Sequence, residues 1–403
     1  MKFLATLNQK SWTYHVDIME TQGMYEMSPE AIEVQNLVRR VAIERVSQRA
    51  AEIDKTGEYP QDMFDLLREL GIFTLPFPEE YGGQNSLLAG CVATEELGRV
   101  CYNTGYLLVV QWTPFGAIMA AGTKAQKDKY LPGLASGSLR AAFSITEPQS
   151  GSDVAGIKTT ARMSNDGWHL SGAKIWCTNA LVSDFIVLAA KTGEARGDIN
   201  FFIVPTDAKG LQIGPKEDKL GARGVPSSPL FLDDVVLPPD AILGEPGKGF
   251  KQVMSALALS RPIIGARAVG LAQGALDLAI DFMRERQAFN QPLTDFQGLR
   301  WMLADMAMQI EAARGLVYKA AQMTDAGVRG KKLAHSAAVA KAYASDIAMK
   351  VATDAVQIFG ASGISNDFPI NRYFRDAKVV QIIEGSNQIQ RNIIAKNLID
   401  GID

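Results

Sequence analysis

One carboxylate stands at an unusual place in the sequence, within the stretch KVVQIIEGSNQIQR over residues 378–391. Glu384 directly follows two isoleucines that suggest burial, and burial raises the pKa of a carboxyl group because its charged form is poorly solvated. Gly385 allows a sharp turn or the close approach of a ligand. Asn387, with a glutamine three residues later, indicates a helix N-cap, which leaves free backbone N–H groups near the acid. The stretch fits a general base beside an oxyanion-binding site, but taken alone it fits an ordinary strand-to-helix corner better.

A second stretch, AAFSITEPQSGSDVAG over residues 141–156, gathers small polar side chains around Pro148, Gly151 and Gly156. Its hydroxyl and amide groups could hold a polar ligand such as a phosphate or the edge of a flavin. Alternatively, its Ser and Asp side chains could satisfy the backbone of a turn. The residues leave both interpretations open.

A tryptophan and a threonine lie two residues apart in AKIWCTN, residues 173–179, and therefore on one face of a predicted strand. Trp176 could stack on a planar cofactor while Thr178 donates a hydrogen bond to its edge. A tryptophan in such a strand is more often part of the core, so the core interpretation is favoured when this segment is considered alone.

Two further segments combine a long predicted helix with possible ligand contacts. In RERQAFNQPLTDFQ, residues 284–297, Arg286 could bind a pyrophosphate through two parallel hydrogen bonds, or it could complement the helix dipole. In QIFGASG, residues 357–363, Gly360 and Gly363 could form a plain C-cap or allow a ligand to approach the backbone. In both segments the structural interpretation is the commoner one.

Several familiar sites are missing from the sequence. There is no G-x-G-x-x-G motif after a strand and no G-x-x-x-x-G-K-[ST] motif, so a nucleotide cofactor would have to be held in another way. Cys91, Cys101 and Cys177 form no C-x-x-C pair, and the three histidines are scattered. We therefore predict neither a metal site nor a disulfide framework.

Three zones of the chain differ in their patterns and must position these residues. Residues 27–138 open with a capping signal and an early proline, then show the apolar spacing of helices. Residues 139–245 change to a period of two between Gly, Asn and Asp turns, which predicts an antiparallel β-sandwich or barrel. Residues 246–403 return to long alanine-rich amphipathic helices that suit a four-helix bundle. We predict an α+β multidomain fold, preceded by a poorly ordered extension over residues 1–26.

The composition excludes several classes of protein. Of 403 residues, 47% are hydrophobic and 21% are charged, as in a soluble globular protein. The 41 basic and 44 acidic residues nearly cancel, which argues against nucleic-acid binding. No uninterrupted apolar run of about 18 residues predicts a membrane span, and the opening segment makes a poor signal peptide. With so few cysteines, a reducing compartment fits, either a bacterial cytoplasm or a mitochondrial matrix.

Together and in this order, several motifs resemble those of the acyl-CoA dehydrogenase flavoprotein family. The resemblance runs from about Met27 to Ile402 and implies an N-terminal helical domain, a middle β domain and a C-terminal four-helix bundle. It also implies non-covalently bound FAD and a homotetramer built as a dimer of dimers. The motifs are TEPQSGSD (146–153), IWCTN (175–179), RERQAF (284–289), DAVQIFGASG (354–363) and IIEGSNQIQR (382–391).

The resemblance also implies two sets of FAD contacts. In the first set, Trp176 would pack on the flavin ring and Thr178 would bond near its N5 atom. The remaining members of this set would be Phe143, Ile145, Thr146, Gly151, Ser152, Ser386 and Gln388. The second set would reach the adenylate of FAD from a neighbouring subunit, and comprises Arg286, Phe289, Gln297, Gln357 and Gly360.

By the same resemblance, Glu384 is the catalytic base that takes the pro-R α-proton of an acyl-CoA while a hydride leaves the β-carbon for flavin N5. The product would be the trans-2-enoyl-CoA, and an electron-transfer flavoprotein would accept the electrons. The Glu384 N–H and a ribityl hydroxyl of FAD would polarise the thioester carbonyl. Ser152, Arg261 and Gly385 would contact the substrate, with Arg261 near the CoA-pantetheine end.

The sequence departs from the family pattern at three places. Ala258 replaces a frequent acidic residue near Arg261, Ile383 replaces an aromatic residue, and residues 221–230 are less rich in Ser and Thr. The alternative to dehydrogenation is a non-oxidative lyase, desulfinase- or decarboxylase-like, on the same fold. That reaction would need an acid-binding group in the acyl pocket, for which Arg223 is a candidate.

Overall fold

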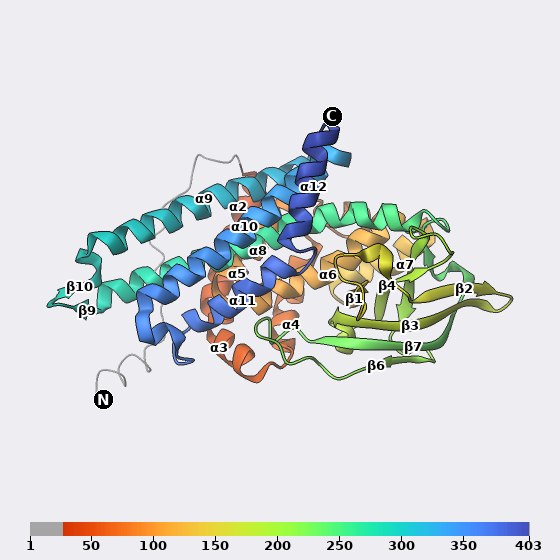
Figure 1. The fold of residues 1–403 in the computed structure, drawn as a ribbon, viewed down its shortest axis with the longest axis horizontal. Coiled ribbons are helices and arrows are strands. Elements are labelled where there is room, and N and C mark those ends of the chain that lie inside the picture. The colour runs from red at the N-terminus through yellow and green to blue at the C-terminus, as the bar shows by residue number, and fades with distance from the viewer. Residues whose placement is uncertain (1–26, 403) are drawn as a thin grey trace.

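The computed structural model describes residues 27–402, so the predicted extension over residues 1–26 lies outside the described residues. A helical domain comes first, a β domain follows, and a second helical domain completes the chain (Figure 1). The predicted fold class is confirmed. In Figure 1 the sheet lies at the right-hand side of the molecule and the β9–β10 hairpin at the left-hand tip.

The N-terminal helices begin where the sequence supplies caps. The Ser28 hydroxyl accepts a hydrogen bond from the Ala31 N–H at the start of α2, and Thr123 and Gln126 form a capping box at the start of α7. Helices α5 and α6 are buried along most of their length, so this domain surrounds its own core. Its helices are α2 (Pro29–Val41), α3 (Ser47–Thr56), α4 (Gln61–Glu69), α5 (Leu87–Val100), α6 (Tyr102–Ala121) and α7 (Lys124–Ser136).

The middle domain is one eight-stranded sheet, in the order β6-β7-β3-β1-β4-β5-β8, with β2 paired to both β3 and β4. Most neighbours are antiparallel, as predicted, but β1 and β4 run parallel, which the sequence did not reveal. Strands β4 and β5 are buried on both faces because the helices cover one side. The strands are β1 (Ala141–Ser144), β2 (Thr160–Ser164), β3 (Gly167–Thr178), β4 (Phe185–Lys191), β5 (Ile199–Pro205), β6 (Leu211–Ile213), β7 (Ser227–Leu237) and β8 (Ile242–Leu243).

The C-terminal domain packs four helices together and adds a fifth. Helices α8 to α11 contact one another as a bundle, and α12 lies against α10. A short hairpin joins α8 to α9 at the far end of the bundle (Figure 1). The elements are α8 (Gly249–Glu285), β9 (Gln287–Ala288), β10 (Gln291–Pro292), α9 (Gln297–Asp325), α10 (Gly330–Phe359), α11 (Ile370–Ile382) and α12 (Asn387–Asp400).

Helix α8 is central to all three domains. Over its 37 residues it contacts α5 and α6 of the first domain, β5 of the second, and α9 and α10 of the third. Within the described residues, the part Leu259–Glu285 is the one helix long and apolar enough to cross a membrane, but 83% of its apolar window is buried inside the protein. Its composition therefore reflects its place in the core.

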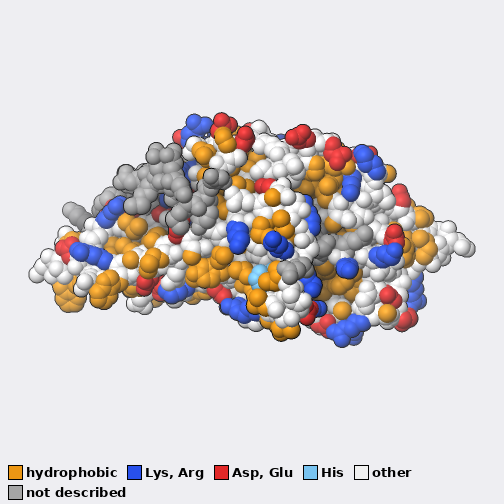
Figure 2. Space-filling model, turned by 90° about the horizontal axis from the view of Figure 1, so that it is seen from above, with side chains coloured by type: hydrophobic (Ala, Val, Ile, Leu, Met, Phe, Trp, Pro, Cys, Tyr) orange, Lys and Arg blue, Asp and Glu red, His pale blue; other side chains and the backbone are white. Residues whose placement is uncertain are grey.

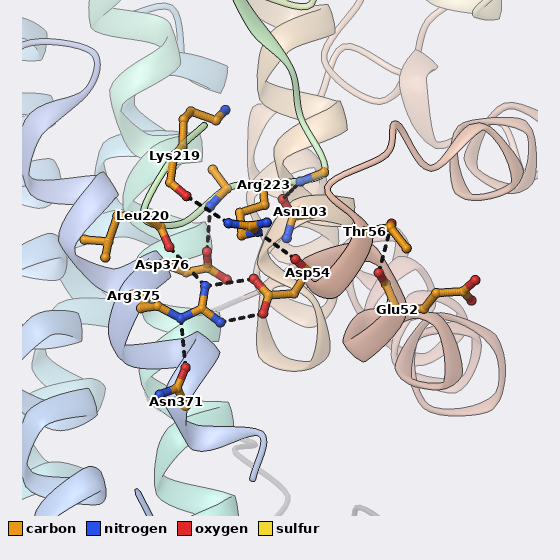
Figure 3. Close-up of polar contacts among 12 residues, drawn as sticks. Glu52, Asp54, Thr56, Asn103, Lys219, Leu220, Arg223, Asn371, Arg375 and Asp376 are labelled. Atoms are coloured by element: carbon orange, nitrogen blue, oxygen red, sulfur yellow. Dashed lines mark hydrogen bonds and ion pairs between the residues drawn. The ribbon is translucent and has the colours of Figure 1, made fainter. Parts of the chain in front are cut away.

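The segment before β7, residues 214–226, is tied to the bundle and to the first domain (Figure 3). Its Ala222 N–H donates to the Asp376 carboxylate of α11 at 2.7 Å. The neighbouring Arg375 forms an ion pair with Asp54 of α3. Burial raises the pKa of Asp376 to about 7, although the hydrogen bond from Ala222 opposes the shift. This seam joins residues more than 300 positions apart and fixes the sheet against the helices.

Candidate active site

Glu384 lies in the four-residue corner between α11 and α12. The corner joins two helices, so the predicted strand-to-helix geometry is wrong: the apolar run before Glu384 is the last turn of a helix. Glu384 has φ +56° and Gly385 has φ +85°, and a non-glycine residue in this region is strained. Ile382 is 59% exposed, which contradicts the expectation that both isoleucines are buried, whereas Ile383 packs partly against the core. The strain at Glu384 marks the corner as a candidate functional site.

The residue that caps α12 is Ser386, whereas the sequence predicted Asn387. Asn387 lies inside the first turn, where its amide oxygen accepts from the Lys341 ammonium and the Ser345 hydroxyl, each at 3.0 Å. Its amide nitrogen donates to Asp346 at 2.6 Å. The buried asparagine therefore anchors the corner to α10.

The backbone of the corner is held from two further sides. The Gly385 carbonyl accepts from Lys341 Nζ at 3.0 Å and from Gln390 Nε2 at 2.9 Å. A Cβ atom at position 385 would lie 2.8 Å from Gln390 Nε2, so a side chain there would displace this donor. Glycine is thus required for the turn and for the support of Glu384.

The Glu384 carboxylate lies among cations. Burial raises the pKa of Glu384, while Arg267, Lys341 and Arg261 hold it down, in that order of strength. Burial lowers the pKa of Lys341 to about 8, and Glu384 opposes that shift. The net effect is a raised pKa, which makes the carboxylate a stronger base, as suits a general base.

Arg267 and two tyrosines of α6 were not predicted to belong to the site. The Arg267 guanidinium lies 3.8 Å from the ring centroid of Tyr106 and 4.2 Å from that of Tyr102. Burial raises the pKa of Tyr106. Arg267 and the Thr178 hydroxyl lower this pKa, whereas the Glu384 carboxylate raises it, so all these groups are neighbours of Tyr106. The one signal in the sequence was a lone arginine in the apolar run GARAVGLAQG.

The loop TEPQSGSD is built on a buried ion pair. Glu147 accepts from Lys174 Nζ at 2.7 Å and from the N–H groups of Lys158 and Thr159 at 2.6 and 3.0 Å. Burial alone would raise the pKa of Glu147, but Lys174 and the N–H donors lower it to about 2. The base of the loop is therefore a closed structural network.

The outer part of the same loop is open. Gly151 and Ser152 are exposed, and no atom lies within 4 Å of a Cβ built on Gly151. Nothing packed against Gly151 within the chain requires a glycine. The open part of the loop fits an external ligand better than internal packing.

Trp176 sits at an irregularity where β3 shifts its register against β7, between Lys174 and Cys177. Its φ of +59° is strained for a tryptophan, and 52% of its surface is exposed. The core interpretation of this residue is therefore wrong. An exposed indole in a strained backbone fits a face on which a planar ring can stack.

Other members of the first predicted set cluster near Trp176. Phe143 of β1 and Thr178 of β3 are register partners, and the Thr146 carbonyl accepts from the Ile175 N–H at 2.9 Å. Ile145 lies between them on the chain and is half-buried. Ser386 and Gln388 lie apart from these strands, at the beginning of α12. The cluster supplies backbone groups, hydroxyls and an aromatic face. Its member Thr178 shares Tyr106 as a neighbour with Glu384.

The second predicted set lies elsewhere in the chain. All five residues are exposed, and they occupy the β9–β10 hairpin, the start of α9 and the end of α10, at the opposite end of the molecule from the sheet (Figure 1). Phe289 is 90% exposed. Figure 2 shows hydrophobic side chains gathered on that part of the surface, where the hairpin and α9 lie. Within one chain this set, Arg286, Phe289, Gln297, Gln357 and Gly360, does not join Glu384.

Comparison with known sequence families identifies all three domains. The N-terminal domain of acyl-CoA dehydrogenases matches residues 28–138, the middle domain matches residues 142–235, and the C-terminal domain matches residues 247–399. The chain belongs to the acyl-CoA dehydrogenase family. It is accordingly a flavoprotein oxidoreductase of that family, acting on acyl-CoA.

Relatives of this acyl-CoA dehydrogenase extend over nearly its whole length. A cyclohexane-1-carbonyl-CoA dehydrogenase of Geobacter metallireducens is 42% identical over 381 residues, covering 93% of this chain and 99% of the relative. The butyryl-CoA dehydrogenase structure from Megasphaera elsdenii superposes with a TM-score of 0.89 at 36% identity, covering 93% and 99% of the two chains. A glutaryl-CoA dehydrogenase in complex with glutaryl-CoA gives a TM-score of 0.88 at 35% identity, covering 93% and 96%.

Arg261 of this dehydrogenase is buried, and its Nε has no hydrogen-bond partner among the described residues. Burial lowers the pKa of Arg261, and the Glu384 carboxylate opposes that shift, so the two charged groups lie near one another. The side chain of Ala258, where the sequence departs from the family pattern, lies outside the described residues.

Proposed function

We propose that this enzyme removes two hydrogens from the α- and β-carbons of an acyl-CoA, giving the trans-2-enoyl-CoA, with Glu384 as the base. The observation that supports this assignment is the Glu384 carboxylate, which is partly buried on a strained backbone, lies among three cations and shares Tyr106 as a neighbour with Thr178. When bound, FAD supplies the acceptor at N5 for the hydride that leaves the β-carbon.

The chain's part in the reaction is to hold and move one proton. The Glu384 carboxylate takes the α-proton, and Lys341 and Gln390 fix the Gly385 carbonyl and so the backbone from which the carboxylate projects. The raised pKa of Glu384 makes its carboxylate a stronger base than an exposed glutamate. We assign the Glu384 N–H to the thioester carbonyl, whose charge grows as the α-proton leaves.

We propose that FAD lies over the exposed face of Trp176, with Thr178 near N5. The open loop, the half-buried strand ends and the start of α12 would complete the site, through Phe143, Ile145, Thr146, Gly151, Ser152, Ser386 and Gln388. The exposed residues at the β9–β10 end would reach the FAD of a neighbouring subunit, in a homotetramer. The β9–β10 hairpin lies at the opposite end of the molecule from β3, which carries Trp176, and this separation within one chain supports a shared site.

For the substrate, we assign Ser152, Arg261 and Gly385 to the thioester and pantetheine portions. Trp112 of α6 is buried and donates to the Phe73 carbonyl at 2.9 Å. It borders a cavity of about 190 Å³ that is also lined by Ile263. We propose an electron-transfer flavoprotein as the electron acceptor and a bacterial cytoplasm as the location, as the bacterial relatives suggest.

The lyase alternative loses its proposed acid-binding residue. Arg223 donates to the Asp54 carbonyl at 2.8 Å and to Asp218 at 3.2 Å (Figure 3). Its guanidinium therefore has a structural role in the seam beside α3. Because these hydrogen bonds already occupy the Arg223 guanidinium, the lyase reaction lacks its acid-binding group and dehydrogenation is favoured.

Anaerobic titration of the purified flavoprotein with a panel of acyl-CoA thioesters tests the proposal. We expect at least one thioester to bleach the flavin absorbance of the wild type, and Glu384→Gln to bind the same thioester without bleaching. If a thioester is converted to product while the flavin stays oxidised, the reaction is not a dehydrogenation.

A further inference from the structure

Arg267 is a buried cation that nothing in the described chain neutralises by contact. Its side chain is fully buried, and none of its three guanidinium nitrogens has a hydrogen-bond partner among the described residues. Its close contacts are the faces of Tyr102 and Tyr106. Because the flat guanidinium lies over these rings, its N–H donors remain available at its edge.

A second donor beside Arg267 is also unpaired. The Tyr102 hydroxyl is buried and has no hydrogen-bond partner among the described residues. Burial raises the pKa of Tyr102, with Arg267 opposing, so the hydroxyl stays protonated and can donate. A buried donor without an acceptor costs about 1–3 kcal/mol, and more when it is charged. Two such donors in contact indicate that a ligand supplies the missing acceptor.

The charges around Glu384 show what kind of acceptor fits. Arg261, Arg267 and Lys341 act on the Glu384 carboxylate, and the Asp346 carboxylate also acts on Lys341. Because Asp346 is itself paired with Arg391, an excess of positive charge remains around Glu384. Lys341 is hydrogen-bonded to a carbonyl and an amide, and these neutral groups do not cancel its charge. Glu384 makes no hydrogen bond to Arg267 and must remain free to take a proton. A second anion would balance the site, and a planar carboxylate matches the guanidinium fork.

We propose that Arg267, together with the Tyr102 hydroxyl, binds a carboxylate carried by the acyl group, so that the substrate is the CoA monothioester of a dicarboxylic acid. The proposal rests on the proposed function, because it takes the acyl group to lie between Glu384 and Thr178. Arg267 would act by selecting and orienting the acyl group, and the proton would still pass from the α-carbon to Glu384.

The experiment compares succinyl-, glutaryl- and adipyl-CoA with the terminal amide of each. An amide has nearly the same shape as the carboxylate but no charge. Affinity is measured by calorimetry in the Glu384→Gln background, where no turnover occurs, and flavin bleaching is followed separately in the wild type. Arg267→Gln, Arg267→Lys and Tyr102→Phe are tested, with Arg45→Gln, an exposed arginine, as the control.

We expect one dicarboxylic thioester to bind at least tenfold more tightly than its amide. Arg267→Gln should weaken the binding of the carboxylate ligand about 100-fold, as removal of one partner of a buried charge pair does. The same variant should weaken the binding of the amide ligand less than threefold. Arg267→Lys, which keeps the charge but loses the fork, should fall between. Tyr102→Phe should reduce the preference for the carboxylate over the amide about fivefold. This variant tests the proposal if the arginine variants do not fold.

Equal binding of every carboxylate and its amide to the parent enzyme would overturn the proposal. An equal loss of affinity for the carboxylate and the amide in Arg267→Gln would also overturn the proposal. If the pH profile of flavin reduction shifts as well, Arg267 is a positioning residue for Glu384. If the carboxylate preference holds but no thioester bleaches the wild-type flavin, the proposed function fails while the binding assignment stands.

Discussion

Two fully buried cations of the molecule, Lys174 and Arg267, differ in whether they have hydrogen-bond acceptors among the described residues. Lys174 donates to the Glu147 carboxylate at 2.7 Å and to the Ile145 carbonyl at 3.1 Å. Arg267 has tyrosine faces beside it and no hydrogen bond among the described residues. The first network is complete within the chain, and the second lacks an acceptor.

The difference separates structural from functional chemistry in this fold. A fully satisfied buried network rigidifies the structure, whereas an incomplete one is costly unless a ligand completes it. The Glu147–Lys174 pair holds the base of the TEPQSGSD loop in place. In the group around Arg267 and Glu384, the guanidinium nitrogens of Arg267 and the Tyr102 hydroxyl have no hydrogen-bond partner among the described residues. Variants that remove single groups can test this contrast.

The largest effect should follow from the incomplete region. We expect Glu384→Gln to lower the rate of flavin reduction by about 10²- to 10⁴-fold, the usual contribution of a general base. Thermal stability should change little, because the Glu384 carboxylate has no hydrogen-bonded partner to lose among the residues that the structure describes. Stopped-flow absorbance measures the rate, with exposed Glu194→Gln as the control. A loss smaller than tenfold would remove Glu384 from the role of base.

In the complete network around Glu147 and Lys174, a substitution should lower the free energy of unfolding. Glu147→Ala leaves Lys174 buried and unpaired, which typically costs about 3–5 kcal/mol. The exposed pair of Asp153 with Arg196 is the matched control, and Asp153→Ala should cost less than about 1 kcal/mol. Denaturant unfolding measures both variants.

Replacing both partners sharpens the same test. Glu147→Leu combined with Lys174→Met removes the unpaired charge, so the double variant should be more stable than Glu147→Ala. If the double variant is less stable than Glu147→Ala, Lys174 contributes more through its packing and its hydrogen bond to the Ile145 carbonyl than its unpaired charge costs.

The seam at Asp376 should give a smaller, pH-dependent effect. Because the folded pKa is raised to about 7, the folded state holds a proton that the unfolded state has lost above about pH 4. The free energy of unfolding should therefore decrease as pH rises from about 4 to 7, by at most roughly 4 kcal/mol. Asp376→Asn keeps an acceptor for Ala222 and should flatten this slope. An unchanged slope in the variant would assign the pH dependence to another group.

The smallest effect on folding should come from Trp176. Since the indole is largely exposed and its backbone is strained, Trp176→Gly should change the free energy of unfolding by less than about 1 kcal/mol. The affinity for FAD should fall clearly, because the stacking face is lost. Fluorescence titration of the apoprotein with FAD measures this. A large loss of stability with unchanged FAD affinity would restore the core interpretation.

Local signals in the sequence predicted much of the fold but less of the site. Ser28 and Thr123 mark helix starts through their own hydrogen bonds, so position along the chain suffices to find them. Glu384 was suspected from its neighbours, but its corner was misread because a run of apolar residues cannot distinguish a helix end from a strand. The role of Trp176 depended on a register shift set by β7. Arg267 was missed because its significance lies in tyrosines 161 and 165 positions away and in the lack of a hydrogen-bond partner among the described residues.

The length and contacts of α8 also bear on how the enzyme responds to ligands. A helix that packs against α5, β5 and α10 at once cannot act as a hinge between domains, since any rotation would break a buried face. The seam through Asp376 adds a second restraint. Free and ligand-bound enzymes should thus superpose closely, without domain closure. Water must then be expelled from the reacting carbons by the acyl group itself, so a poorly fitting thioester leaves a wet site and reacts slowly.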